Sequence, residues 1–209
     1  MKSSLLIKKF HLTDKEFITS NEIKFECSSL NLNYENVIRY FLRQKYIIRI
    51  FKGIFYVKSL EEIKYNSIKY SHLKLVAKGL ELKEVKNWYF GLYTALKLNN
   101  ATHEYFTIDY VISDSLYRNK PITINSRKFK FHKLKPSLLK FGIIENKHRY
   151  SDLEKTVLDF IYLWIYNGTQ KRRILMNISG YAKNISESKI RDYIHWYPKS
   201  VKEIINEIM

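Results

Sequence analysis

The sequence predicts an α+β protein: an N-terminal winged helix-turn-helix, then a mixed α/β domain with C-terminal helices. Two observations predict this class. Helical stripes of apolar residues, several with a capping residue in front, alternate with short segments in which every second residue is apolar. The 209 residues are 45% hydrophobic, which is enough to form one large domain or two small ones.

Three helices are predicted before residue 44. An apolar cluster indicates a short opening helix at Leu5, Leu6, Ile7 and Phe10. Thr19 or Ser20 can cap a second helix that carries Ile23, Phe25 and Cys27, and Glu22 completes a capping box from Thr19. Asn33 is placed to cap the third helix, whose inward face consists of Tyr34, Val37, Ile38, Phe41 and Leu42.

A β-hairpin follows the third helix directly. The β-rich runs IIRIF and IFYVK are separated by Lys52-Gly53, where glycine can supply the positive φ angle of a tight turn. Helix, helix, turn, helix and hairpin is the order of a winged helix-turn-helix. This pattern assigns residues 1–58 to a DNA-binding domain.

The third helix of such a domain enters the major groove of DNA, so its outward side chains are the candidates for base recognition. They are Asn33, Asn36, Arg39, Tyr40 and Arg43. Asparagine suits adenine and arginine suits guanine, because each can form two hydrogen bonds with that base edge. Basic residues of the hairpin are expected to contact phosphates: Arg49, Lys52 and Lys58.

The charge balance favours polyanionic partners. The chain has 37 Lys+Arg against 20 Asp+Glu, a net charge of +17, which favours nucleic acid first and an anionic membrane surface second. An AT-rich genome would explain the many lysines but not the shortage of carboxylates. The single cysteine excludes an internal disulfide, and no window is apolar for long enough to span a bilayer. We therefore expect a soluble, cytoplasmic protein without a membrane partner.

A helical connector is predicted over residues 59–87, and a second domain over residues 88–209. In this domain a buried helix is expected from Trp88 to Asn99-Asn100, a strand at 107–113, and a hairpin at 121–135 around Asn125-Ser126. A helix is expected over DLEKTVLDFIYLWIYN, and two more follow Ser186 and Pro198. Within the DLEKTVLDFIYLWIYN helix, Lys155 and Asp159 have the spacing of a structural i, i+4 ion pair.

Residues 118–149 are more basic than the N-terminal domain, with ten Lys+Arg and one acid, Glu145. The candidate auxiliary basic surface consists of Arg127, Lys128, Lys130, Lys133 and Lys135, and Lys171-Arg172-Arg173 could extend it. Two interpretations have equal weight. The surface either binds the DNA backbone and enlarges the footprint, or it is a solvated sheet face whose lysines protect exposed strand edges.

Signals for catalysis are weak. There is no P-loop and no G-x-S-x-G sequence, so we expect no catalytic residue, no metal and no cofactor. The alternative is a Mg²⁺-dependent nuclease of the second domain, with Glu145 and Lys147 beside Asp109 or Asp114. A further alternative is an interaction module whose basic face binds an acidic protein.

Three segments carry a family resemblance: RIFKGIFYV (49–57), YFGLYTALKLN (89–99) and EKTVLDFIYL (154–163). In this order the chain resembles, over residues 1–165, the AbiEi-type antitoxins of type IV toxin–antitoxin systems, which are bacterial and archaeal transcriptional regulators. The resemblance implies that the winged helix binds double-stranded operator DNA and represses its own operon, through the third-helix residues above and through Arg49 and Lys52. The wing tip here is only Lys52-Gly53, so deep insertion into the minor groove is not expected.

The resemblance also implies a role for the second domain. It would support repression and counter a nucleotidyltransferase-like toxin without forming a stable complex with it. Operators are often repeats, so two copies of the chain per site are expected. Dimerisation on DNA is one way in which two copies could bind, and the sequence leaves the oligomeric state open.

Overall fold

The computed structural model describes residues 2–209, apart from the side chains of Lys2 and Lys183. The chain forms two compact units. One contains the residues up to Lys86 together with Thr123–Arg127, and the other contains Asn87–Ile122 together with Lys128–Met209. The second unit begins at Asn87, one residue before Trp88, and the stretch predicted as a connector falls within the first unit except for Asn87.

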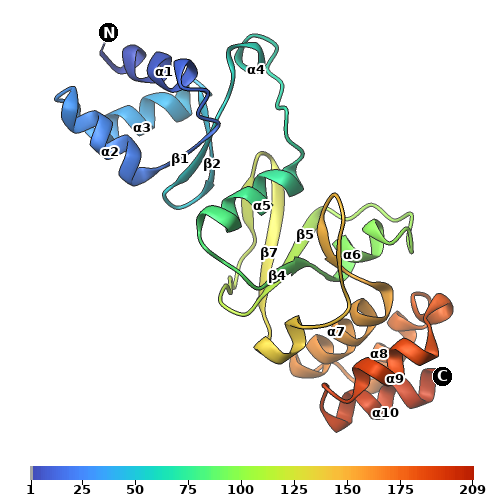
Figure 1. The fold of residues 1–209 in the computed structure, drawn as a ribbon. Coiled ribbons are helices and arrows are strands. Elements are labelled where there is room, and N and C mark those ends of the chain that lie inside the picture. The colour runs from blue at the N-terminus through green and yellow to red at the C-terminus, as the bar shows by residue number, and fades with distance from the viewer. Residues whose placement is uncertain (1) are drawn as a thin grey trace. The chain divides into compact units, whose positions relative to one another are not determined.

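The first unit combines helices with a small antiparallel sheet (Figure 1). Its elements are α1 (Lys2–Leu12), β1 (Phe17–Thr19), α2 (Ser20–Ser29), α3 (Tyr34–Arg43), β2 (Ile47–Phe51), β3 (Ile54–Val57), α4 (Leu60–Lys64) and α5 (His72–Leu82). The three predicted helices and the hairpin are confirmed. Strand β1 was not predicted, because three residues are too few to show an alternating pattern. It pairs with β3, so the sheet order is β1-β3-β2.

Local signals begin the helices where the sequence predicts. Thr19 and Glu22 form the complete capping box of α2, and the side chain of Asn33 caps α3. The core of the unit lies between these helices and the hairpin, with Ile23 and Phe41 wholly buried. Phe25 differs from Ile23 and Cys27 of the same helix, which are buried, because 74% of its surface is exposed.

The second unit is built on a six-stranded mixed sheet with the strand order β6-β7-β5-β4-β9-β8, although the turn end of the β6–β7 hairpin, Thr123–Arg127, is grouped with the first unit. The strands are β4 (Trp88–Phe90), β5 (Ile108–Ser113), β6 (Ile122–Ile124), β7 (Arg127–Lys133), β8 (Ile143–Glu145) and β9 (Arg149–Ser151). The helices are α6 (Leu92–Leu98), α7 (Leu153–Tyr166), α8 (Lys171–Ile178), α9 (Glu187–Ile194) and α10 (Lys199–Ile208), with short 3-10 turns at Pro136–Leu139 and Ala182–Asn184.

One prediction for this unit is wrong. Residues 88–90 form strand β4, whereas a single helix was expected from Trp88 onward. This strand lies inside the sheet, antiparallel to β5 and parallel to β9, and all three of its aromatic side chains are buried. A strand that is buried on both faces shows a continuous apolar run rather than an alternation, which explains the error.

The helical layer of the second unit is organised around α7, which packs against α6, α8, α9 and α10. The main core cluster joins Tyr89 and Ile112 of the sheet to Leu158 and Ile161 of α7. The predicted strand at 107–113, the hairpin at 121–135 and the helices after Asp152, Ser186 and Pro198 are confirmed. Strands β8 and β9 and helix α8 were not predicted.

Candidate nucleic-acid interface

The outward face of α3 carries the exposed side chains of Asn36, Arg39 and Arg43, with the exposed acid Glu35 one turn before Arg39. Their spacing of three and four residues aligns them along one side of the helix, opposite the buried Val37 and Phe41. Within the described residues, no hydrogen bond or ion pair engages the guanidinium of either arginine. Both groups are therefore available to an external acceptor.

Two other predicted base-reading residues have structural roles. The Oδ1 atom of Asn33 accepts the backbone N–H of Asn36 at 3.0 Å, so it is not free for a two-bond contact with adenine. Tyr40 is half-buried and packs against Phe41 and Tyr46, with ring centroids 6.0 Å and 5.9 Å away. The pKa of Tyr46 is raised, first by a hydrogen bond with Tyr40 and then by burial. These findings leave Asn36, Arg39 and Arg43 as the candidates for base recognition on α3.

The β2–β3 hairpin presents two of its three predicted phosphate contacts. Gly53 adopts φ +81° in the turn, and the neighbouring Lys52 is exposed. Arg49 is exposed on β2, and its guanidinium lies 5.6 Å from the ring centre of its cross-strand partner Phe55. The ring restricts the arginine without neutralising it, so the charge remains available.

Lys58 does not fit the predicted role. It is only 4% exposed, so it does not belong to the accessible basic surface of the hairpin. Its backbone explains the burial: the N–H donates to the carbonyl of Tyr46 at 2.9 Å, and its own carbonyl oxygen lies 2.9 Å from Nε2 of His11. The residue is held between α1 and the start of β2, which a sequence pattern cannot show.

Residues at the start of α2, which were not predicted as part of the site, join the hairpin to α3. The N–H of Ser20 donates to the carbonyl of Gly53 at 2.8 Å, and its hydroxyl lies 2.7 Å from the hydroxyl of Tyr34. Lys24 is exposed, with its ammonium 5.3 Å from the ring centre of Tyr34. These contacts fix the hairpin turn beside the first turn of α3. These contacts join residues that are distant in the sequence, so the sequence pattern did not predict them. Lys24 could have been considered only because it is another basic residue.

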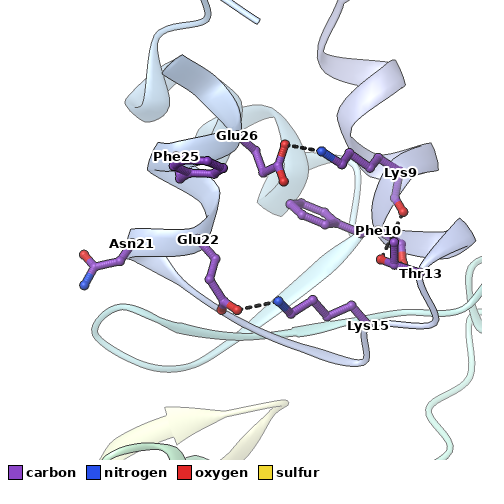
Figure 2. Close-up of a pocket in the computed structure, with 8 residues that line it drawn as sticks. All are labelled: Lys9, Phe10, Thr13, Lys15, Asn21, Glu22, Phe25 and Glu26. Atoms are coloured by element: carbon purple, nitrogen blue, oxygen red, sulfur yellow. Dashed lines mark hydrogen bonds and ion pairs between the residues drawn. The ribbon is translucent and has the colours of Figure 1, made fainter. Parts of the chain in front are cut away.

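A cavity of about 480 Å³ lies between α1 and α2 (Figure 2). Its charged side chains pair with one another: Lys9 with Glu26 at 2.6 Å, and Lys15 with Glu22. Figure 2 shows both pairs and the exposed ring of Phe25. Every charge in this lining has a partner, so the cavity offers no free group to a charged ligand.

The candidate auxiliary basic surface divides into two sets. Lys128 and Lys130 lie on one face of β7, while Arg127 and Lys133 have the opposite parity, which they share with the buried Phe129 and Phe131. Lys130 is half-buried, donates to the backbone carbonyl of Asn119, and has its ammonium 5.9 Å from the ring centre of Tyr117. The exposed members are Lys128, Lys133 and Lys135.

His132 lies on the same face of β7 as Lys128 and Lys130. Its ring stacks on that of Tyr110, with 6.0 Å between centroids and 13° between the ring planes. Burial, followed by the nearby charge of Lys130, lowers the pKa of His132 to about 4. His132 therefore adds no positive charge to this face at neutral pH.

The carboxylates of the alternative nuclease site are separated. Glu145 lies on β8 and pairs with Arg149 at 3.0 Å, while Asp109 is buried on β5 beside Thr94. Strands β5 and β8 are three positions apart in the sheet, which is about 14 Å at the usual strand spacing. Asp114 follows β5 and accepts a hydrogen bond from Asn87 at 2.6 Å. The residues that the structure describes contain no group of three or more His, Cys, Asp or Glu that could hold a metal ion.

The EK…D segment of α7 forms a buried polar cluster. Lys155 and Asp159 are wholly buried and pair at 3.1 Å. Asp159 also accepts hydrogen bonds from the hydroxyls of Tyr89 and Tyr197, both at 2.7 Å. The ammonium lies over the ring of Phe141 at 4.8 Å from its centre. Burial lowers the pKa of Lys155, and Asp159 opposes that shift. The predicted structural pair is confirmed.

Glu154 of the same segment has a structural role too. It accepts the backbone N–H of Ser186 at 2.8 Å and lies 3.4 Å from the ammonium of Lys189. These contacts hold the start of α9 against α7. The acid, the lysine and the aspartate of the segment are therefore all engaged within the second unit.

Comparison with known proteins gives a fold relationship. No protein-family model and no curated protein sequence matches the chain. Among solved structures, the RV2827C protein from Mycobacterium tuberculosis matches with a TM-score of 0.62 and 7% sequence identity, over 99% of this chain and 75% of that one. This similarity establishes a shared mixed α+β fold. None of the helices within residues 2–209 combines the length and apolar character needed to cross a bilayer.

Proposed function

We propose that the chain is a sequence-specific DNA-binding repressor in which the first unit is a winged helix-turn-helix. The order α1, β1, α2, α3 and the β2–β3 hairpin supports this proposal, as does the pairing of β1 with β3. In this arrangement α3 is the recognition helix, and the hairpin is a short wing.

One observation carries the proposal: Asn36, Arg39 and Arg43 are aligned, exposed and unpaired within the described chain, and they lie on the helix that Ser20 ties to the hairpin turn. Asparagine and arginine are the residue types that form two hydrogen bonds with adenine and guanine. Lys52 at the turn is placed to contact a phosphate, which sets the register without reading sequence.

We further propose that the repressor is the antitoxin of a type IV toxin–antitoxin system, which autoregulates its operon and counters a nucleotidyltransferase-like toxin. The resemblance of the hairpin, the α6 segment and the EK…D helix to AbiEi-type antitoxins supports this part. We expect the chain to counter this toxin without forming a stable complex with it. Expression beside the nucleotidyltransferase-like product of a neighbouring gene should restore growth, and persistent growth arrest would contradict the antitoxin role.

The DNA-binding test uses fluorescence anisotropy with a duplex from upstream of the chain's own gene and a random duplex of equal length. Arg39→Ala with Arg43→Ala should weaken binding to the upstream duplex at least about thirtyfold, since each bidentate contact contributes about 1–3 kcal/mol. Arg191→Ala is the control, because Arg191 is an exposed arginine of α9. Wild-type affinity in the double variant, with the fold intact by circular dichroism, would show that α3 is not the reading helix.

A further inference from the structure

A second cavity of the first unit, of about 760 Å³, lies among the end of α1, the end of β3 and α4. This volume is within the range of about 300–1,000 Å³ that is usual for small-molecule sites. The lining residues that bear on a ligand are Lys58, the acids Asp14, Glu16, Glu61 and Glu62, and the apolar Leu60. It belongs to neither the α3 face nor the hairpin turn.

Lys58 is the unusual member of this lining. The residue is only 4% exposed, yet nowhere in the described part of the chain does a hydrogen bond or ion pair engage its ammonium. The ammonium nevertheless keeps contact with solvent at the cavity, because Nζ of Lys58 is not among the wholly buried polar atoms that lack a partner in the described residues. The other buried lysine, Lys155, differs: its side chain is wholly enclosed, and Asp159 pairs with it at 3.1 Å.

The remaining charges of the lining differ in whether they are already engaged. Glu16 pairs with Lys69 at 2.6 Å. Glu62 is buried and accepts hydrogen bonds from the hydroxyl of Tyr56 and from two backbone N–H groups, so it needs no further donor. Asp14 and Glu61 are exposed, and no contact within residues 2–209 engages either carboxylate.

We propose that this cavity binds a small zwitterion with an apolar body, of the size of a free amino acid. The carboxylate of the ligand supplies the missing partner of Lys58. Its ammonium is held by Asp14 or Glu61, whose negative charges also disfavour an anion with several charges, such as a nucleotide. The apolar body covers Leu60, an apolar residue of the lining with 67% of its surface exposed.

The position of Lys58 gives the ligand a route to α3. Its N–H donates to the carbonyl of Tyr46 at 2.9 Å, and the ring of Tyr46 packs edge-on against Tyr40 of α3 at 5.9 Å. A ligand that restrains Lys58 therefore acts on the residues supporting the C-terminal end of α3. Any resulting change in DNA affinity rests on the proposed DNA-binding function, whereas the binding of the zwitterion does not.

Isothermal titration calorimetry of the full chain without DNA tests the site directly. The probes are L-leucine and L-phenylalanine, together with phenethylamine, which lacks the carboxylate, and 3-phenylpropionate, which lacks the ammonium. At least one amino acid should bind with a Kd below about ten millimolar. If L-phenylalanine binds, each of its two analogues should bind at least tenfold more weakly. Absence of binding by both amino acids would overturn the proposal, as would equal binding of L-phenylalanine and phenethylamine.

Variants assign the binding to this cavity. Lys58→Met keeps the apolar stem and should weaken amino-acid binding at least tenfold, while Lys8→Met, at an exposed position of α1 outside the lining, should leave it unchanged. Asp14→Asn with Glu61→Gln changes only exposed side chains, so the fold should be preserved even if Lys58→Met unfolds. The acidic double variant should weaken binding of the amino acid at least tenfold but not binding of 3-phenylpropionate. Unchanged amino-acid binding in folded Lys58→Met or in the acidic double variant would refute the site.

Discussion

Helices α3 and α7 each carry two charged residues four positions apart, and the two units use them in opposite ways. Arg39 and Arg43 of α3 are exposed and have no partner in the part of the chain that is described. Lys155 and Asp159 of α7 are wholly buried, and they pair with each other at 3.1 Å. The spacing is the same, but the environments differ.

The difference shows that spacing places side chains on one face of a helix but does not say what that face meets. On α3 the apolar residues occupy the opposite side, so the charges reach solvent and can be satisfied by another molecule. On α7 both sides are covered by protein, so each charge must find its partner inside the fold. The exposed charges of α3 are open to another molecule, whereas the buried charges of α7 are already satisfied within the fold.

The largest expected effect is on the buried pair. Asp159→Asn should lower the free energy of unfolding by about 3–5 kcal/mol, because it leaves the ammonium of Lys155 buried without its counter-ion. Glu187→Gln is the matched control, since Glu187 pairs with Arg191 at the same spacing and the same 3.1 Å, but in solvent. The control should change stability by less than about 1 kcal/mol. Urea denaturation measures both, and equal losses would show that burial does not distinguish the pairs.

The second prediction distinguishes exposed charges that contact phosphates from exposed charges that recognise bases. Lys128→Gln with Lys133→Gln should weaken binding to the upstream duplex and to a random duplex equally, because phosphate contacts carry no sequence information. If both lysines contact phosphates, the slope of log affinity against log salt should decrease by about two. Anisotropy titrations at several salt concentrations measure this. If affinity falls for the upstream duplex alone, sequence recognition must be assigned to the second unit. If affinity does not change for either duplex, these lysines belong to a solvated surface that does not contact DNA.

His132 is intermediate between the exposed arginines of α3 and the buried ion pair of α7, because it is partly buried and not charged at neutral pH. Burial lowers its pKa to about 4 in the folded state, below the usual 6.5, so the unfolded chain binds the proton first as the pH falls. Its contribution to stability is present above about pH 6.5 and is lost towards about pH 4. His132→Gln should therefore reduce the loss of stability between about pH 7 and about pH 5 in urea denaturation. An identical loss in the variant would show that other groups control this pH range.

The smallest effect is expected on α3 itself. Arg39→Ala should change the free energy of unfolding by less than about 0.5 kcal/mol, since an exposed arginine without a partner contributes little and alanine is a good helix former. Thermal denaturation by circular dichroism measures the change. A loss above about 2 kcal/mol would mean that Arg39 has a structural role, and DNA-binding data from the Arg39 variants would then need another control.

Much of the fold was predictable, because its signals are local. The capping box of Thr19 and Glu22, the cap at Asn33 and the turn at Gly53 each depend on a few consecutive residues. Strand β4 was not predictable in this way, because its buried neighbours β5 and β9 come from distant parts of the chain. The candidate site follows the same division: the exposure of Arg39 and Arg43 followed from helical periodicity, while the burial of Lys58 did not.

The sequence by itself determined where most helices begin, which side of α3 is apolar, and that the chain carries a large excess of positive charge. Only the tertiary structure decided which charges remain accessible. A lysine in a sequence has the same stem and ammonium whether it becomes Lys52 at an exposed turn, Lys155 in a paired core or Lys58 in the lining of a cavity. Accessibility depends on contacts between residues that are far apart in the chain, and those contacts form only when the chain folds.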